Sequence, residues 1–123
     1  MDDRAAIVET VTNYWEGWFA GDPDRMRLAL HPRLVKTGAG ISGPDNLLTP
    51  AMSADQMVGW TRDGIGVAAK PDDPAYEIVV NDVYHPIASV TVHSGVYREY
   101  LLLGLTPEGW RIVKAFYTNV HAA

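Results

Sequence analysis

The sequence predicts an α+β domain in which helices come first along the chain and antiparallel strands follow. In residues 3–20, apolar side chains recur every three or four positions, as they do in amphipathic helices. From Tyr76 onward the chain is instead rich in Val, Ile, Tyr and Trp, with turn signals between the runs. At 123 residues, 47% of them hydrophobic, the chain can form its own core, so we predict a single domain over residues 1–123.

The first two helices are predicted from their ends. Residues 3–20 form the first, and Gly21 suits the left-handed cap that ends it. Asp22 followed by a proline is a typical helix start. This second helix should end at His31, because a residue before proline avoids the α region. A short strand over residues 34–37 comes next.

A third helix is predicted from Ser53, which forms the S-x-x-Q pattern of a capping box with Gln56. We expect Gly64 to close this helix. A flexible stretch containing Pro71 and Pro74 should follow it.

The strands are predicted over residues 76–84, 87–97 and 98–120, and Gly95 should bulge or break the middle run. In the last strand, strict alternation places Trp110, Ile112 and Phe116 on one face and Val113, Ala115 and Tyr117 on the other. Both faces would then be apolar, and soluble proteins rarely leave such a surface exposed. We therefore predict a homodimer through the outer face of the sheet.

Composition excludes several classes of partner. The net charge is −5 and the basic residues are scattered, so we expect no nucleic acid and no membrane partner. No apolar run approaches the roughly 18 residues of a membrane span. The chain has no cysteine and its N-terminus lacks the pattern of a signal peptide, which favours a cytoplasmic protein.

A glycine pattern, Gly38, Gly40 and Gly43, matches G-x-G-x-x-G, but no helix follows it at once, so we interpret it as a mobile loop. The histidines show neither H-x-x-x-H nor H-x-H spacing, and no G-x-S-x-G elbow exists. We therefore expect no cofactor and no metal.

The segments YWEGWFAGDPDRMRLALHPRLVK, MSADQMVGW and GWRIVKAFY occur in the order found in the nuclear-transport-factor-2-like superfamily. Within it, the chain resembles the small branch labelled putative lumazine-binding. The resemblance implies a strongly curved antiparallel sheet wrapped around the N-terminal helices, with a conical pocket inside. It also implies homodimers through the sheet and binding of a small ligand.

Ketosteroid isomerase, in the same superfamily, performs acid–base chemistry in that pocket. Its oxyanion-donating tyrosine corresponds to Tyr14 here. The position of its catalytic aspartate corresponds to Gly38, which has no carboxylate to abstract a proton. Isomerase chemistry of that kind is therefore not expected.

We predict a domain that binds a small cyclic or aromatic molecule in an apolar conical pocket. The alternative is an acid–base enzyme of the isomerase, cyclase or dehydratase kind that uses His31 or Asp82 with Tyr14. A third hypothesis is a dimeric accessory protein whose cone is filled. Trp15 is expected in the core. The candidate ligand-binding residues are Tyr14, Trp18, His31, Trp60, Asp82, Tyr97 and Tyr117.

Overall fold

The fold was analysed in a computed structural model, which describes residues 2–41 and 47–120. Two helices, α1 (Asp3–Ala20) and α2 (Pro23–Ala29), precede the strand β1 (Leu30–Gly38). The helices α3 (Ala54–Arg62) and α4 (Ile65–Ala69) come next. The strands β2 (Tyr76–Tyr84), β3 (Ile87–Ser94), β4 (Tyr97–Thr106) and β5 (Gly109–Asn119) complete the chain. The predicted α+β class is confirmed. No helix in these two ranges is both long and apolar enough to cross a bilayer.

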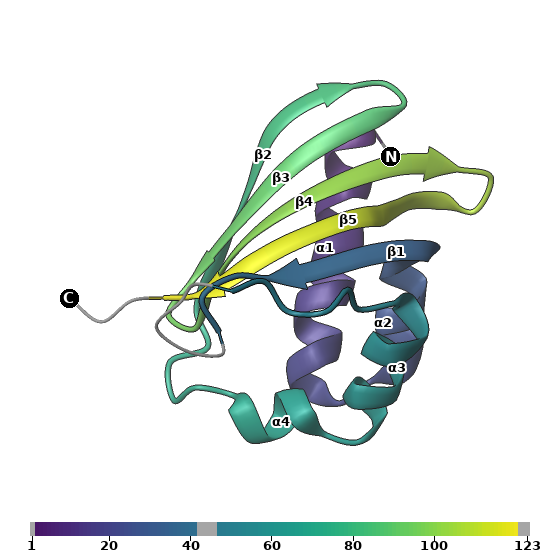
Figure 1. Cartoon of the computed structure of the whole chain (residues 1–123). Helices are drawn as coiled ribbons and strands as arrows, with labels where there is room; N and C mark the ends of the chain where they lie inside the picture. The colour runs from purple at the N-terminus through teal and green to yellow at the C-terminus, as the bar shows by residue number, and fades with distance from the viewer. Residues whose placement is uncertain (1, 42–46, 121–123) are drawn as a thin grey trace.

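The strands form one curved sheet in the order β1-β5-β4-β3-β2, and α1 lies across its inner face (Figure 1). The pairings among β2, β3, β4 and β5 are antiparallel, as predicted. β1 instead pairs with β5 in parallel, so the sheet is mixed rather than wholly antiparallel. The chain between β1 and β5 includes two helices and three strands, which is ample length for a parallel pairing.

The predicted helix ends are largely confirmed. Gly21 adopts a left-handed conformation (φ 68°), and Asp22 caps α2, which begins at Pro23. Ser53 and Gln56 form both hydrogen bonds of the capping box. In each case a local side-chain or backbone preference decides the boundary, which is why the sequence predicts it.

Two segments differ from the prediction. α2 ends at Ala29 and β1 begins at once, so His31 lies in a strand rather than at a helix end. Gly64 (φ 80°) does follow α3, but α4 occupies part of the stretch that we expected to be flexible. At Gly95, the predicted alternative of a break is the one observed, because Gly95 lies in the hairpin between β3 and β4.

The predicted faces of β5 are wrong beyond Val113. Leu102 pairs with Lys114 and Leu103 pairs with Ile112, so Val113 is an extra residue in β5. Such a bulge reverses the alternation after it. Trp110 and Ile112 therefore share the inner face with Ala115 and Tyr117, whereas Phe116 is exposed on the outer face.

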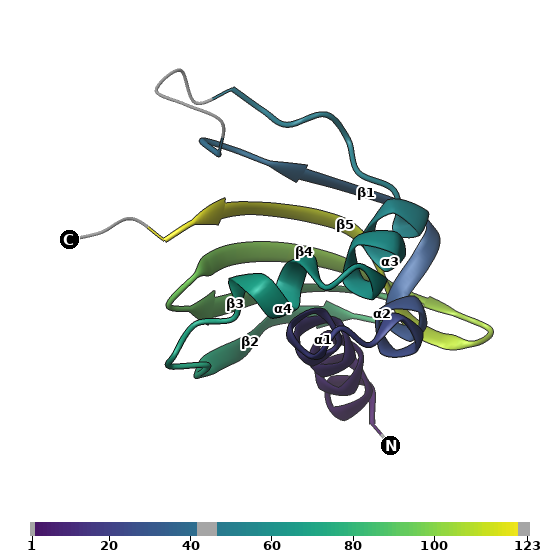
Figure 2. The same ribbon diagram turned by 90° about the horizontal axis from the view of Figure 1, so that it is seen from below.

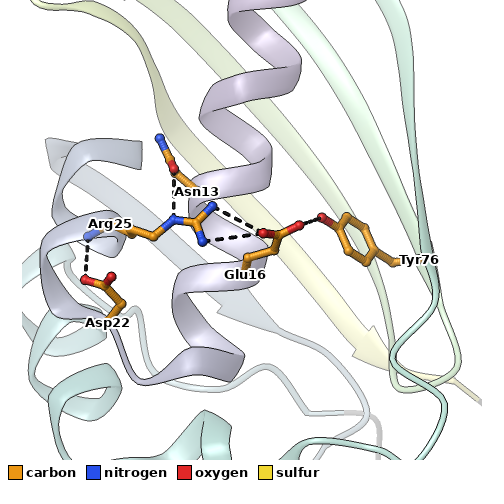
Figure 3. A network of polar contacts seen from close by, with 5 residues as sticks. All are labelled: Asn13, Glu16, Asp22, Arg25 and Tyr76. Atoms are coloured by element: carbon orange, nitrogen blue, oxygen red, sulfur yellow. Dashed lines mark hydrogen bonds and ion pairs between the residues drawn. The ribbon is translucent and has the colours of Figure 1, made fainter.

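A polar network ties α1 to α2 and to β2 (Figure 3). The Arg25 guanidinium donates to Asn13 Oδ1 at 3.1 Å and to Glu16 Oε1 at 3.4 Å, which ties α2 to α1. The Tyr76 hydroxyl donates to Glu16 Oε2 at 2.6 Å, which ties β2 to α1. Burial and this hydrogen bond raise the pKa of Tyr76 to about 12. The network thereby links α1 to a helix on one side and to the edge strand β2 on the other.

A close approach between α4 and the end of α1 makes Gly66 a sensitive position. A β-carbon at Gly66 would lie 2.2 Å from the Trp18 carbonyl oxygen and 2.7 Å from its ring. We expect Gly66→Ala to lower the free energy of unfolding by about 1–3 kcal/mol, the usual cost of overpacking. Urea denaturation measures this change.

Gly59→Ala is the matched control, because Gly59 is also helical and a β-carbon there would meet no atom within 4 Å. This substitution should raise the free energy of unfolding by about 0.5–1 kcal/mol, the helical advantage of alanine over glycine. Changes of the same sign at both positions would contradict the close approach of α4 to α1.

Candidate ligand-binding site

A cavity of about 310 Å³ lies between the C-terminal half of α1 and the sheet. α3 and α4 lie beside that end of α1 (Figure 2) and contribute to the cavity wall. Most of the lining is aromatic or aliphatic, with one polar cluster. The lining residues are Tyr14, Trp15, Trp18, Phe19, Lys36, Met52, Met57, Trp60, Ile65, Tyr97, Glu99 and Tyr117.

The polar cluster consists of Tyr14, Lys36 and Glu99. The Tyr14 hydroxyl donates to Glu99 Oε2 at 2.8 Å, and Lys36 Nζ lies 3.1 Å from the same oxygen. Lys36 Nζ also donates to the Tyr14 hydroxyl. Burial, followed by the negative charge of Glu99, raises the pKa of Tyr14 well above its usual range. The Tyr14 hydroxyl therefore stays protonated and can act as a donor.

Strand alternation places these groups at the cavity. On β4, Glu99 faces inward between Tyr97 and Leu101. On β1, Lys36 faces inward two residues after Leu34. Only 2% of Glu99 is exposed, and a carboxylate that is so buried requires a partner. Lys36 supplies the opposite charge, so the cluster carries no net charge.

Aromatic rings surround the lysine. Lys36 Nζ lies 4.6 Å from the centre of the Tyr117 ring and 5.1 Å from that of Tyr14, which are cation–π distances. Burial raises the pKa of Tyr117 and that of Tyr97. The Tyr97 ring in turn packs edge-on against Trp15 and Tyr117. The ammonium thus lies against the π faces of two rings.

Gly38 makes room for one of these rings. A β-carbon at Gly38 would lie 2.8 Å from Tyr117 Cε1, so only glycine allows the tyrosine to approach β1 this closely. Gly38 is also the position at which the resemblance to ketosteroid isomerase would place a catalytic aspartate. In this chain the Tyr117 ring fills that space.

Five of the predicted site residues come together in the cavity wall: Tyr14, Trp18, Trp60, Tyr97 and Tyr117. Trp15 is 4% exposed and packs in the core, as expected, while its edge also reaches the cavity. The two remaining candidates, His31 and Asp82, do not line this cavity.

His31 Nδ1 accepts a hydrogen bond from the Arg33 backbone N–H at 3.0 Å, at the start of β1. Asp82 is exposed on the outer face of the sheet, beside Tyr84. An extra residue in β2 causes this placement, because Val80 pairs with Val90 whereas Asp82 pairs with Ser89. The bulge at Asn81 is not visible in the sequence pattern.

The sequence predictions missed Lys36 and Glu99, although a signal for both exists. Glu99 alternates with Leu101 and Leu103, and Lys36 alternates with Leu34. A charge in an otherwise apolar, inward-facing series marks a buried charge that needs a partner.

Cofactor motifs find no structural counterpart in the described residues. Between residues 2 and 41 and between 47 and 120, no three His, Asp or Glu side chains are grouped as a metal ion would require. Gly43 and His121 lie outside these ranges. Gly38 ends β1, and among the described residues after it the next helix begins at Ala54, so no described helix N-terminus adjoins Gly38 or Gly40 as in a dinucleotide site.

Both the sequence and the fold of the chain are similar to those of known proteins. Residues 2–118 match the family described as putative lumazine-binding. A similar structure is an NTF2-like protein of unknown function from Shewanella baltica OS155, with 21% identity, a TM-score of 0.71, and coverage of 97% of this chain and 94% of the other. Another, from Silicibacter pomeroyi DSS-3, has 20% identity, a TM-score of 0.69 and 95% coverage of both chains.

A ketosteroid isomerase-like protein from Erwinia carotovora atroseptica SCRI1043 is also similar, with 20% identity and a TM-score of 0.61 over 98% of this chain and 95% of the other. At these identities the structural similarity concerns the fold. No protein with a curated description matches the chain.

Proposed function

Because the chain belongs to the putative lumazine-binding family of the nuclear-transport-factor-2-like superfamily, we propose that it binds a small cyclic or aromatic molecule in the cavity beneath α1. One observation carries the proposal: an aromatic-walled cavity of about 310 Å³ has a buried donor–acceptor cluster on its surface. Ligand sites combine mostly apolar walls with a few placed polar groups in this way.

The cavity defines the kind of ligand that fits. Its volume is at the lower end of the roughly 300–1,000 Å³ of small-molecule sites, so the ligand is small. The indole and phenol rings of Trp18, Trp60 and Tyr97 favour a flat partner that can stack. Since Lys36 and Glu99 cancel each other's charge, a neutral ligand is favoured over an ion. An ammonium has three N–H donors, of which Tyr14 and Glu99 engage two, leaving one for a ligand carbonyl.

Trp18→Ala tests the role of the cavity wall. Trp18 is half-buried at the end of α1, and we expect its loss to weaken the binding of lumazine by about 1–3 kcal/mol, the contribution of one aromatic contact. Isothermal titration calorimetry measures the affinity, and a thermal melt measures stability.

Leu28→Ala is the control, because Leu28 is exposed on α2 and does not line the cavity. It should leave the affinity for lumazine unchanged. If Trp18→Ala also left the affinity unchanged and only lowered the melting temperature, Trp18 would be a core residue and no part of the binding site.

Acid–base catalysis remains the second candidate function, because Tyr14 offers a protonated hydroxyl beside the Glu99 carboxylate. In this version Glu99 is the base, since His31 and Asp82 lie elsewhere and Gly38 has no side chain. Deuterium exchange at the carbon next to the carbonyl of a cyclic enone tests it by NMR. Enzyme-dependent exchange that disappears in Glu99→Gln would support catalysis, whereas its absence leaves binding alone.

We also propose a homodimer through the outer face of the sheet. That face carries an outer patch of exposed apolar side chains: Tyr84, Ile87, Tyr100, Leu102 and Phe116. Two shallow hollows in the patch adjoin Leu102 and Lys114. Contiguous apolar surface of this kind is typical of protein interfaces.

Leu102→Asp should convert the dimer to a monomer, because a carboxylate in the outer patch, even beside Lys114, would have to lose its water on association. Leu28→Asp is the control: the two leucines are equally exposed (53% and 54%), but Leu28 lies on α2. Multi-angle light scattering at micromolar concentration should show dimers for the unmodified chain and for Leu28→Asp. A monomer in all three samples would contradict the proposal.

A further inference from the structure

We propose that Lys36 captures carbonyl compounds covalently, with its amine condensing with an aldehyde or ketone to form an imine inside the cavity. This inference rests on the proposed function, because it uses the same cavity, and adds a covalent step that can fail while noncovalent binding stands. It assigns to the chain a modification site and a ligand class, small aromatic aldehydes and ketones.

The position of the amine is the first argument. The Lys36 side chain is only 10% exposed, yet the residue lines the cavity. The other lysines of the chain, Lys70 and Lys114, are exposed on the surface. A lysine in a water-poor pocket is the usual setting of a Schiff-base lysine, because loss of hydration disfavours the charged ammonium relative to the nucleophilic amine.

The groups around the amine are the second argument. Imine formation requires a proton acceptor for the ammonium, a donor for the departing oxygen and an oriented carbonyl carbon. Glu99 Oε2, 3.1 Å from Lys36 Nζ, supplies the first two functions in turn. The Tyr14 hydroxyl is hydrogen-bonded to both groups and thereby holds the amine and the carboxylate close together.

The proton and electron balance closes within the cluster. The ammonium of Lys36 transfers one proton to the Glu99 carboxylate, and the free amine attacks the carbonyl carbon to form a C–N bond. A proton then moves from nitrogen to the former carbonyl oxygen, which gives a carbinolamine. Glu99 returns its proton to the hydroxyl, the C–O bond breaks and water leaves. The product is a protonated imine beside a carboxylate, so Glu99 again has a cationic partner.

The walls of the cavity favour the dehydrated product. The Tyr117 ring lies 4.6 Å from the reacting nitrogen, and Trp18 and Trp60 add apolar surface to the wall of the same cavity. Such a surface excludes bulk water, which would otherwise hydrolyse the imine. The same rings can stack on an aromatic aldehyde and hold its carbonyl near Lys36.

Reductive trapping tests the proposal on the unmodified chain. The protein is incubated with 2-naphthaldehyde and sodium cyanoborohydride, and peptide mass spectrometry follows the labelling of each lysine. Because a positioned acid–base group accelerates proton transfer on the order of 10²-fold or more, Lys36 should be labelled far faster than Lys70 or Lys114, although it is buried. Equal labelling of all lysines, or labelling of the exposed ones alone, would overturn it.

Three variants and one analogue sharpen the test. Lys36→Arg keeps the positive charge but should lose the cavity label, whereas Lys70→Arg should keep it. Glu99→Gln should slow the labelling of Lys36 without changing that of Lys114; an unchanged Lys36 rate would count against the mechanism. 2-Naphthalenemethanol, which has no carbonyl, should quench tryptophan fluorescence without forming an adduct.

The alcohol separates capture from binding. If it binds but the aldehyde does not label Lys36, covalent capture is wrong and noncovalent binding stands. If neither compound enters the cavity, both the capture of aromatic aldehydes and the proposed binding of flat aromatic molecules fail. Labelling of Lys36 together with binding of the alcohol supports both.

Discussion

Lys36→Met should lower the free energy of unfolding by about 3–5 kcal/mol, because it leaves the Glu99 carboxylate buried without its partner. Glu99 is only 2% exposed, so water cannot replace the lost ammonium. Glu99→Gln, which leaves Lys36 without its carboxylate partner, should lower the free energy of unfolding by less, because the lysine side chain is more exposed to solvent than that of Glu99 (10% against 2%). Urea denaturation at neutral pH measures both losses.

A double variant and a surface pair provide the controls. Lys36→Met combined with Glu99→Leu removes both charges, and much of the lost stability should return, since apolar replacements of buried ion pairs are often neutral or better. The exposed pair Arg27–Asp55, at 2.7 Å, should contribute no more than about 1 kcal/mol when Arg27 is changed to alanine. If Lys36→Met cost as little as Arg27→Ala, the cavity would be open enough for water to solvate Glu99.

The protein should also lose stability steeply at alkaline pH. Burial raises the pKa values of Tyr14, Tyr97 and Tyr117, and that of Tyr76 rises to about 12. A tyrosine whose pKa is raised by folding stabilises the folded state fully below its unfolded pKa and loses that contribution as the pH rises toward its folded pKa. Stability should therefore fall as the pH rises above the ordinary value of 10.0.

Tyr14 dominates this effect because it is the most deeply buried of the four. If it keeps its proton in the folded state, it alone should remove about 2 kcal/mol of stability between pH 10 and about pH 12. Urea denaturation at a series of pH values measures the slope. In Tyr14→Phe the slope should be shallower, even though its stability at neutral pH is lower. An equal slope in both proteins would show that Tyr14 is not the group responsible.

Local signals in the sequence predicted the element boundaries well, whereas contacts between distant segments were out of reach. The cap at Gly21 and the box from Ser53 to Gln56 depend on neighbouring residues only. α4 is five residues long, and its Gly66 packs directly against Trp18, far away in the sequence. Helices so short depend on tertiary packing rather than on propensity, so a local pattern does not predict them.

The aromatic part of the site was predictable because the α1 stripe and the family resemblance both indicate it. Tyr14 and Trp18 face the cavity for the same helical-periodicity reason that the sequence suggested. The charged part was not predicted, because the candidates were His31, for its place at an expected helix end, and Asp82, for its place inside an apolar strand of unknown register. Strand register decides which polar side chains face inward, and a one-residue slip reverses it. Counting alternation from Leu101 would have identified Glu99.

The extra residue Val113 shifts the alternation of inward-facing and outward-facing side chains along β5 by one position. Residues before Val113 and residues after it obey opposite odd–even rules, so Tyr117 faces the cavity while Phe116 belongs to the outer patch. Deleting Val113 would remove the bulge and leave both assignments as they are, because Lys114 and the residues after it would continue the regular alternation from Ile112. Regular pairing with Val113 retained would instead turn Tyr117 to the outer patch and Phe116 to the cavity. The bulge therefore keeps the side chains of the pocket and of the outer patch in place while β5 carries one residue more than its partner.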